Sequence, residues 1–335
     1  MKNKLKFLIS SIENLFSTKG LVYYISEIED WVIKDIGKSI SEYSSKKVKL
    51  GYSSLFIRNS VIHFGSLNTY LSQPFSPHKS NKLIVTWYHI PNSFHFNGSL
   101  KEKTDKVDIW ITSNSLTKSK LLKLGIAKHK IELVPLAVES IFNKSDKKEY
   151  KNENKPFVIG SFLKDGSGWG EGNQPKYVKG PDILVKTLIE LNKRHEITVK
   201  LSGPSRGFVI SSLKENKIQF EHNFFENKND LIEYYKTCDI CLITSREEGG
   251  PLSLLESMAL GIPVISTKVG MAVDIIKDGY NGYLLDIDDL NGLLSKISSL
   301  IINRNKLKCL ANNCKTTIIK GYVNTVKIID GIYEK

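Results

Sequence analysis

The sequence predicts an α/β protein of two domains, each a parallel sheet covered by helices. Short runs rich in β-branched and aromatic residues alternate with helical patterns along most of the 335 residues, which is typical of βαβ units with right-handed crossovers. This length suffices for two full cores. A charged, nearly apolar-free run over 143–155 predicts an exposed linker. We therefore expect domains over 1–145 and 156–308, a hinge over 146–155, and a C-terminal helical segment over 309–335 that packs back on the first domain.

The first domain is predicted to begin with an amphipathic helix. Six apolar residues recur three and four positions apart and form one face: Leu5, Leu8, Ile9, Ile12, Leu15 and Phe16. Three lysines stand at its start: Lys2, Lys4 and Lys6. The favoured interpretation is a helix that packs this apolar face on its own domain. The alternative is a helix that lies on an anionic membrane.

Strands and helices then alternate through both domains. In the first domain we expect strands over 61–64, 83–87, 107–112 and 131–134, with a helix over 115–124. In the second we expect strands over 157–160, 197–201, 239–244 and 264–266. Helices are expected over 181–191, 231–236 after an Asp230 cap, 252–260, 290–302 and 309–333. The loop over 161–180 holds five glycines and is long for an α/β connection, which favours a functional or mobile segment.

The stretch over 245–266 indicates a ligand site. A strand, a loop with Gly249, Gly250 and Pro251, a short helix from Leu252, and a second strand place backbone N–H groups at the carboxyl edge of a sheet, where anions bind. Two carboxylates, Glu248 in the loop and Glu256 in the helix, flank that position. Carboxylates accept hydroxyl hydrogen bonds with fixed geometry. The pattern therefore favours a nucleotide sugar, with hydroxyls on both sides of its diphosphate.

This stretch closely resembles the E-x7-E segment of retaining glycosyltransferases of the family 4 class, which includes bacterial polysaccharide and lipopolysaccharide transferases. The resemblance implies the GT-B fold, in which two Rossmann-like domains face each other across a cleft. It implies that the nucleotide sugar binds the second domain, and that Glu248 contacts the donor sugar and Glu256 the ribose. The alternative is that both glutamates are solvated residues of a loop and a helix.

The resemblance assigns further donor contacts in the second domain. Lys179 and Gly180 match a family Lys-Gly pair on the diphosphate, and Ser161 stands where the family has a basic residue. Lys164, in the same loop, is our candidate for the role of that basic residue. Either lysine could instead be solvated surface.

Two more residues complete this donor site. Gly203 ends a strand aimed at the same edge, and Phe224 or Phe225 is similar to the family's wall of the base pocket. The alternative for either Phe is ordinary core. Together with the glycine-rich segment from Gly249 to Leu252, these residues form the predicted donor pocket.

His89 is the candidate site residue of the first domain. It follows the strand over 83–87, where an open α/β sheet places ligand contacts. Related transferases carry a His after the matching strand, near donor sugar and acceptor, and so the resemblance favours a functional His89. The alternative is a half-buried, hydrogen-bonded ring, and we expect His63 and His95 to be structural.

Besides Ser161, the chain departs from the family pattern in three places. No strand followed by a glycine-rich loop is recognisable before Gly51, and Gly37 is the only and poor candidate for that loop. Ala137 replaces a usual Gly, and Asp274 replaces a usual Glu.

No metal and no cofactor besides the donor substrate are expected. Asp286, Asp288 and Asp289 mimic a D-x-D motif, but Asp288 or Asp289 is well placed to cap the following helix. The four cysteines, Cys238, Cys241, Cys309 and Cys314, lie in apolar or helical runs and are expected in reduced form. A zinc or redox site is the alternative.

The charge is concentrated in the first half of the chain. Residues 1–155 carry 25 Lys and Arg against 14 Asp and Glu, whereas residues 156–335 carry 23 against 21. A basic surface attracts nucleic acid, anionic lipid or a phosphate-bearing substrate. No nucleic-acid-binding motif accompanies the charge, so nucleic acid is not an expected partner. Neither a membrane span nor a secretory signal is recognisable, and we expect a cytoplasmic protein, with inner-leaflet contact as a further expectation.

The resemblance implies transfer of a sugar from a UDP-, GDP- or dTDP-linked donor to a saccharide or lipid-linked saccharide, with retained configuration, in cell-surface glycan synthesis. The leaving diphosphate then helps to deprotonate the acceptor hydroxyl. The alternatives are a nucleotide-sugar epimerase or phosphorylase on the same fold, and a non-catalytic nucleotide-sugar-binding protein.

Overall fold

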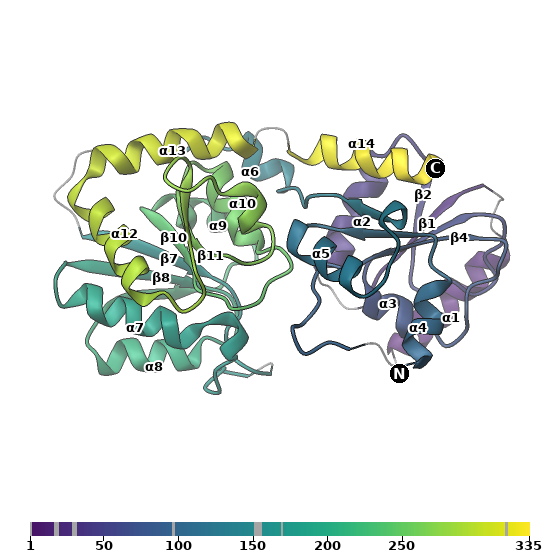
Figure 1. The fold of residues 1–335 in the computed structure, drawn as a ribbon, viewed down its shortest axis with the longest axis horizontal. Helices are drawn as coiled ribbons and strands as arrows, with labels where there is room; N and C mark the ends of the chain where they lie inside the picture. The colour runs from purple at the N-terminus through teal and green to yellow at the C-terminus, as the bar shows by residue number, and fades with distance from the viewer. Residues whose placement is uncertain are drawn as a thin grey trace. The chain divides into compact units, whose positions relative to one another are not determined.

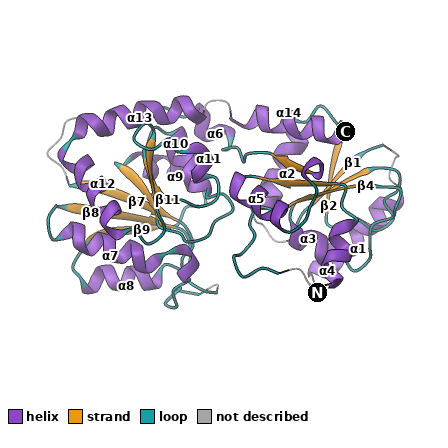
Figure 2. Ribbon diagram, in the orientation of Figure 1, coloured by secondary structure: helices purple, strands orange, loops and turns teal. Residues whose placement is uncertain are grey.

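The protein consists of two compact units. The computed structural model describes residues 2–16, 20–28, 32–95, 98–150, 156–168, 170–318 and 321–335. The front unit comprises Met1–Leu136 together with Val323–Lys335, and the back unit comprises Ala137–Tyr322. Each unit has its own sheet with helices on its faces (Figures 1 and 2).

The front unit is built on a six-stranded parallel sheet. Its strands lie in the order β2-β1-β3-β4-β5-β6. Their bounds are β1 Val22–Ile25, β2 Val48–Gly51, β3 Val61–Phe64, β4 Lys82–Thr86, β5 Ile109–Thr112 and β6 Ile131–Leu133. The helices are α1 Lys2–Leu15, α2 Val32–Tyr43, α3 Leu67–Leu71, α4 Gly98–Asp105 and α5 Ser115–Lys123, and a 3-10 turn, η1, spans Lys128–Lys130. The predicted strands and the helix over 115–124 are confirmed to within two residues at each end.

Strands β1 and β2 were not expected. The four residues of β1 are all buried between β2 and β3, so this short run occupies the middle of the sheet. The residues that follow it, Ser26 and Glu27, include no glycine. Gly37 lies in α2 instead, where a Cβ atom would come within 2.5 Å of the Tyr24 ring. A first strand therefore exists, but Gly37 packs a helix on the sheet and forms no phosphate loop.

The back unit also holds a six-stranded parallel sheet, in the order β12-β11-β10-β7-β8-β9. Its strands are β7 Phe157–Phe162, β8 Ile197–Ser202, β9 Gln219–Asn223, β10 Ile240–Ile243, β11 Val264–Thr267 and β12 Gly282–Leu285. Its helices are α6 Ser140–Lys144, α7 Pro181–Asn192, α8 Gly207–Glu215, α9 Lys228–Lys236, α10 Leu252–Ala259, α11 Ala272–Ile275, α12 Leu290–Ile302 and α13 Arg304–Ile318, with a 3-10 turn, η2, over Tyr177–Lys179. The four residues of β10 and of β11 are buried, as expected for central strands of a parallel sheet.

Helix caps in the back unit agree only in part with the predictions. Asp289 caps α12, because its Oδ1 accepts a hydrogen bond of 2.8 Å from the Gly292 N–H. The predicted Asp230 cap is wrong: α9 begins at Lys228, and the side chain of Asn227 accepts from the Asn229 N–H at 2.8 Å. Asp230 lies in the first turn, where its charge still favours the helix dipole.

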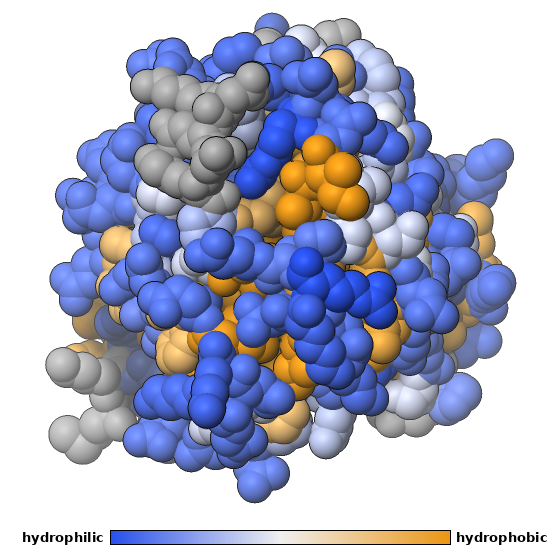
Figure 3. All heavy atoms as spheres, turned by 90° about the vertical axis from the view of Figure 1, so that its left-hand side faces the viewer, coloured by the Kyte–Doolittle hydropathy of each residue, from blue (hydrophilic) through white to orange (hydrophobic). Residues whose placement is uncertain are grey.

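The outer surface of the back unit is mainly hydrophilic. Figure 3 shows the face at the left of Figure 1, where apolar areas appear between polar side chains near the centre. Helices α7 and α12 bury apolar residues such as Leu188 and Ile297 in the core. Most polar residues of these helices face the solvent, as is typical of amphipathic helices that cover a sheet.

The single C-terminal helix predicted over 309–333 is wrong. Two helices occupy this region, α13 in the back unit and α14 Gly321–Glu334, most of which belongs to the front unit. The Tyr333 hydroxyl of α14 lies 2.8 Å from Nδ1 of His63, and Asp330 accepts hydrogen bonds from Ser44 and Ser45. Residues 309–322 therefore group with the back unit, and only the last thirteen residues complete the front unit.

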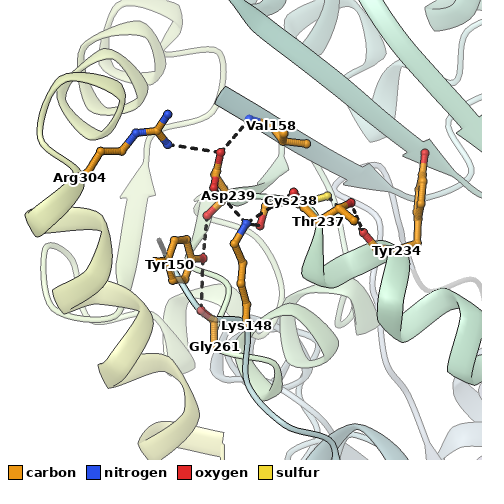
Figure 4. Close-up of polar contacts among 9 residues, drawn as sticks. All are labelled: Lys148, Tyr150, Val158, Tyr234, Thr237, Cys238, Asp239, Gly261 and Arg304. Atoms are coloured by element: carbon orange, nitrogen blue, oxygen red, sulfur yellow. Dashed lines mark hydrogen bonds and ion pairs between the residues drawn. The ribbon is translucent and has the colours of Figure 1, made fainter. Parts of the chain in front are cut away.

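The described part of the predicted hinge, 146–150, is anchored to the back unit and is not an exposed tether. Lys148 Nζ lies 3.0 Å from Asp239 Oδ1 and donates to the Cys238 carbonyl at 2.6 Å (Figure 4). The Tyr150 hydroxyl donates to the Asp239 carbonyl at 2.9 Å. Lys148, Tyr150 and Asp239 line a cavity of about 350 Å³ at the amino ends of β7 and β10. Residues 151–155 lie outside the described residues.

Helix α1 forms as predicted, but its favoured packing is wrong. The six apolar residues of its predicted face are exposed, from 47% for Ile9 and Ile12 to 83% for Phe16. The helix contacts the front unit through Ser10, Ser11 and Asn14, which are buried. The apolar period of this helix therefore marks its outer face.

Candidate functional site

The candidate site lies at the carboxyl edge of the back unit's sheet. Strands β10, β7 and β8 are neighbours and parallel, and so the loops that follow them meet at one edge. These loops begin at Thr244, Leu163 and Gly203. The predicted donor residues of the back unit lie in these three loops, in α10, or, for Phe224, directly after β9.

Lys179 and Glu248 form an ion pair at this edge. Lys179 Nζ lies 2.7 Å from Glu248 Oε2, and the two side chains are 23% and 11% exposed. The other carboxylate oxygen accepts a hydrogen bond of 2.9 Å from the Ser245 hydroxyl. The structure thus brings together the residues predicted to contact the diphosphate and the donor sugar, and it holds the Glu248 carboxylate from both sides.

Gly180 is required for this arrangement. Its φ is +64°, and a Cβ atom on it would lie 1.9 Å from the Thr244 carbonyl oxygen. The Thr244 hydroxyl in turn donates to the Gly180 carbonyl at 2.8 Å. A side chain at position 180 would therefore push η2 off the end of β10 and separate Lys179 from Glu248.

The loop after β7 is folded onto the start of α8. A bridge joins Gly166 to Pro175, and the Ser205 hydroxyl donates to the Gly170 carbonyl at 2.8 Å. A Cβ atom on Gly172 would lie 2.2 Å from the Ser205 carbonyl oxygen, which explains a glycine there. Trp169 lies outside the described residues. The described part of this loop is thus tied down close to Lys179.

Arg206 is a site residue that the sequence analysis missed. Its guanidinium is fully buried and lies 2.9 Å from Asp165 Oδ1. It also donates to the Ser161 carbonyl at 2.7 Å and to the Ser161 hydroxyl at 3.1 Å. An arginine therefore lies beside Ser161, the position at which the resemblance leads one to expect a basic residue. Arg206 also donates to the Ser202 carbonyl at 3.1 Å. It therefore fixes the loop at Asp165 on the ends of β7 and β8.

The loop from Thr244 to Pro251, which includes Glu248, connects β10 to α10. Gly270 approaches it closely: a Cβ atom on Gly270 would lie 2.9 Å from the Glu248 and Gly249 carbonyl oxygens. Pro251 is the residue before α10, with φ −67° and ψ 115°, and Leu252 is the first residue of the helix. Helix α10 therefore begins next to Glu248, with its amino end at the sheet edge where an anion is favoured.

Glu256 lies one turn inside α10 and is held by a buried tyrosine. The Tyr235 hydroxyl donates to Glu256 Oε2 at 2.6 Å. Burial raises the pKa of Glu256 to about 7, and the hydrogen bond from Tyr235 opposes part of that rise. The nearby Glu139 raises the pKa further, while Lys228, ion-paired with Glu139, lowers it. A carboxyl group kept near half ionisation at neutral pH is typical of a functional site.

The raised pKa of Glu256 predicts a pH-dependent stability difference. Between pH 4.5 and about 7 the folded state holds a proton on Glu256 that the unfolded state releases, and so the free energy of unfolding falls across this range as pH rises. Glu256→Gln accepts the Tyr235 hydrogen bond without the charge. We expect urea unfolding at pH 8 to show the variant more stable by on the order of 2 kcal/mol, and equal stability at about pH 5.

Glu233→Gln removes the carboxylate of an exposed residue on α9 and is the matched control. The free energy of unfolding of this variant should differ between pH 5 and pH 8 by as much as that of the wild type. A pH-independent effect of Glu256→Gln would contradict the raised pKa.

Lys176 lies near the ion pair, and Lys164 lies near Lys176. The pKa of Lys176 is lowered, first by burial and then by the charges of Lys179 and Lys164, while Glu248 raises it. Lys176 is therefore within electrostatic range of Lys179, Lys164 and Glu248. Lys176, which the sequence analysis did not single out, is bonded through its backbone N–H to the Asp165 carbonyl at 2.8 Å. Such a concentration of positive charge suits a diphosphate.

The remaining predicted donor residues lie on the neighbouring strands. Gly203 has φ +109°, and a Cβ atom on it would lie 2.9 Å from the Leu163 carbonyl oxygen, so the turn after β8 packs on the loop after β7. Phe224 follows β9 and is 68% exposed, which excludes the alternative of a core residue. The Phe225 ring packs against Tyr234, with centroids 5.0 Å apart. The base-pocket role of Phe224 stays a prediction.

His89 belongs to the front unit. It follows β4, is half-buried, and its carbonyl accepts a hydrogen bond of 2.9 Å from the Trp87 indole. His63 is structural: burial lowers its pKa to about 3, and its ring nitrogens lie 2.8 Å from Tyr333 Oη and Thr86 Oγ1. His95 is exposed. The functional role of His89 stays a prediction.

Cysteines and acidic residues form no metal cluster in the part of the chain that the structure describes. Cys238, Cys241 and Cys314 are buried and Cys309 is exposed, and all four are free thiols. Burial raises the pKa of the Cys241 thiol to about 12.

Part of the back unit resembles known proteins. Residues 173–317, within the back unit, match the family model described as Glycosyl transferases group 1. The UDP-Gal:alpha-D-GlcNAc-diphosphoundecaprenol alpha-1,3-galactosyltransferase of Escherichia coli is 25% identical over 216 residues, which are 61% of this chain and 53% of that enzyme. The capsular polysaccharide biosynthesis glycosyltransferase CapM of Staphylococcus aureus is 26% identical over 215 residues, with 61% and 52% covered. The chain thus spans about half the length of these curated relatives.

Solved structures establish the fold as GT-B. HepE of Anabaena, in complex with UDP and glucose, superimposes with a TM-score of 0.71 at 13% identity, covering 95% of this chain and 100% of that chain. A mutant of Staphylococcus aureus TarM, in a complex that contains UDP, gives a TM-score of 0.66 at 16% identity, covering 84% of this chain and 56% of that chain. The two six-stranded parallel sheets agree with the fold class expected from the sequence.

Proposed function

We propose that this protein is a retaining, metal-independent glycosyltransferase of the family 4 class. Its donor is a nucleotide-linked hexose, and its acceptor is a saccharide or lipid-linked saccharide in cell-surface glycan synthesis at the cytoplasmic side of the membrane. The match of residues 173–317 supports the transferase class. The names of the Escherichia coli and Staphylococcus aureus relatives support the lipid-linked and capsular context.

One observation carries the proposal: Lys179 and Glu248 are in contact at the sheet edge where α10 begins, and Glu256 lies on that same helix. A diphosphate at the start of α10 would meet the helix dipole and the lysine. The sugar on one side of it would meet Glu248, and the ribose on the other side would meet Glu256.

In the proposed reaction, the acceptor hydroxyl oxygen forms a bond to the anomeric carbon while the bond from that carbon to the diphosphate oxygen breaks. The hydroxyl proton passes to the leaving diphosphate, and the new bond forms on the face that the diphosphate leaves. Lys179 and its lysine neighbours stabilise the charge that develops on the diphosphate. Glu248 orients the sugar, and so the protein supplies position and positive potential.

Product analysis tests the proposal. Full-length protein is incubated with UDP-, GDP- and dTDP-hexoses and a panel of saccharide and lipid-linked acceptors, and products are identified by NMR. An α-linked glycoside from an α-linked donor, unchanged by EDTA, is the expected result. A C2-inverted nucleotide sugar would indicate an epimerase, a sugar phosphate formed with inorganic phosphate a phosphorylase, and tight binding without turnover a nucleotide-sugar-binding protein.

Lys179→Ala is expected to weaken binding of nucleoside diphosphates about tenfold to a hundredfold, and binding of the free nucleoside by less than about twofold. A charge-assisted contact is worth a few kcal/mol only where a phosphate is present. Calorimetric titration of UDP and uridine, or of the nucleotide found in the product assay, measures both.

Lys186→Ala, an exposed lysine of α7, is the matched control and should leave both affinities unchanged. Lys164→Ala should show a smaller loss than Lys179→Ala, because only a loop folded over the phosphates would bring Lys164 close to them. Equal losses for nucleoside and diphosphate would contradict the assignment of Lys179.

A further inference from the structure

Helix α1 is attached to the front unit by polar contacts. The Ser11 hydroxyl donates to the Ser53 hydroxyl at 2.8 Å, and the Asn14 amide donates to the Ser53 and Leu55 carbonyls at 2.9 and 3.1 Å. The Ser10 hydroxyl accepts from the Tyr52 N–H at 3.1 Å. Satisfied, buried hydrogen bonds fix the orientation of the helix, and so the opposite face is held outward.

The outward face is almost entirely apolar. It consists of Leu5, Leu8, Ile9, Ile12 and Leu15, with Phe16 directly after the helix, and these side chains are 47% to 83% exposed. In a helix that advances about 100° per residue, they occupy an arc of roughly 120°. Exposed apolar side chains gathered in one arc of this kind mark an interaction surface, because they gain free energy when a partner covers them.

The charges beside this arc are mostly positive. Lys4 lies on one flank and Lys6 on the other, and both are exposed. Glu13, the only acid of α1, lies 3.9 Å from Lys49 of β2. The front unit as a whole carries 22 Lys and Arg against 12 Asp and Glu in residues 1–136 and 323–335. A second copy of this chain would bring like charges together, whereas an anionic surface would complement them.

We propose that α1 is a docking surface for an anionic lipid bilayer. The helix lies in the plane of the interface, its apolar arc enters the headgroup and acyl boundary, and Lys4 and Lys6 reach lipid phosphates on either side. None of the helices among the described residues is long and apolar enough to cross a bilayer. The docking is therefore peripheral and reversible.

A cavity next to α1 could receive the polar head of a lipid when the helix is docked on a bilayer. It has a volume of about 470 Å³ and lies among Asn3 and Phe7 of α1, Glu27 after β1, Tyr52 after β2 and Asn68 of α3. These loops form the carboxyl edge of the front unit's sheet, where polar ligands bind in α/β folds. A bilayer-bound α1 would bring the polar head of a membrane lipid near this cavity. The docking itself does not depend on the proposed transferase activity.

Cosedimentation of full-length protein with vesicles tests the proposal. We expect binding to an equal mixture of phosphatidylglycerol and phosphatidylcholine, little binding to phosphatidylcholine alone, and a steep loss as salt is raised. Leu8→Asn with Ile12→Asn should lower the partition coefficient about tenfold or more. Lys4→Gln and Lys6→Gln should each lower it about fivefold.

Matched controls come from the back unit. Ile302→Asn changes an apolar residue that is 77% exposed, and Lys186→Gln with Lys214→Gln changes two exposed lysines; all three changes should leave binding as in the wild type. A second measurement reports insertion directly. The tryptophan fluorescence that Leu8→Trp shows in excess of the wild type should be quenched by lipids with brominated acyl chains, whereas the excess shown by Ile302→Trp should not.

Several results would overturn the proposal. They are absence of binding to the anionic mixture, equal binding to both vesicle types, and unchanged binding of the Leu8 and Ile12 variant. A wild-type dimer that this variant makes monomeric would assign the surface to a second copy instead. Because no nucleotide or turnover enters these measurements, the docking and the proposed transferase activity can fail separately.

Discussion

Replacing Glu248 with Gln is expected to lower turnover about a hundredfold while nucleoside diphosphate binds as in the wild type. Gln keeps the size of the side chain and can still accept the hydrogen bond from Ser245, but it loses the charge that pairs with Lys179. The proposed contact of Glu248 is to the sugar at the reacting carbon. Its loss therefore raises the barrier more than it weakens ground-state binding.

Steady-state kinetics together with titration of the free nucleoside diphosphate measure this separation. Glu247→Gln, one residue away in the same loop, is the matched control and should retain turnover within a factor of a few. Glu256→Ala should behave in the opposite way, with weaker nucleotide binding as its main effect. If Glu248→Gln weakened nucleotide binding and Glu256→Ala affected only turnover, the two roles would have to be exchanged.

Arg206→Met is expected to destabilise the back unit by about 3–5 kcal/mol, because it leaves the buried carboxylate of Asp165 without its counter-charge. The variant also removes the hydrogen bonds to Ser161 of β7 and to the Ser202 carbonyl of β8, which hold the ends of these strands to the loop. Urea unfolding followed by circular dichroism measures the loss.

The companion variant replaces both partners. Arg206→Met with Asp165→Leu should recover much of the lost stability, since removing both charges of a buried pair costs far less than removing one. Lys193→Met, which breaks an exposed pair with Glu190, should change stability by less than about 1 kcal/mol. A loss below about 1 kcal/mol for Arg206→Met would show that the buried pair does not stabilise the folded state.

The donor edge could be predicted because its signals are local. Residues 239–266 hold a buried strand, a loop with two adjacent glycines, a short helix and a second strand in direct succession, and each has a recognisable residue pattern. The contact between Lys179 and Glu248 joins residues far apart in the sequence. It could be expected only because parallel strands β7 and β10 deliver their loops to one edge.

Arg206 could not be predicted in the same way. Its neighbours Gly203, Pro204 and Ser205 indicate a turn, and an arginine after a turn is usually solvated. Only the three-dimensional position of Asp165 shows why this one is buried. The ionic partner, and with it the anchoring of the loop, depends on tertiary structure that no local pattern carries.

The structure differs from the prediction at β1 and α1 for the same reason, because tertiary contacts decide both. Strand β1 is four residues long with two tyrosines, too short for a clear period, and its place in the centre of the sheet depends on pairing with β2 and β3. Helix α1 shows a strong apolar period, but the period does not say which face is buried. The serines and Asn14 decide that, through partners about 40 residues away.

The position of α14 has a consequence for synthesis of the chain. Residues 1–136 leave the ribosome first, yet the front unit is completed only by residues 323–335. At translation rates of about 5–20 residues per second, the intervening segment takes roughly ten seconds or more to make. The back unit is a continuous part of the chain and can fold in that interval. His63 and Ser45 can form their hydrogen bonds to Tyr333 and Asp330 only after residues 323–335 have been made. Part of the front unit is thus translated before the back unit and yet reaches its final packing after it.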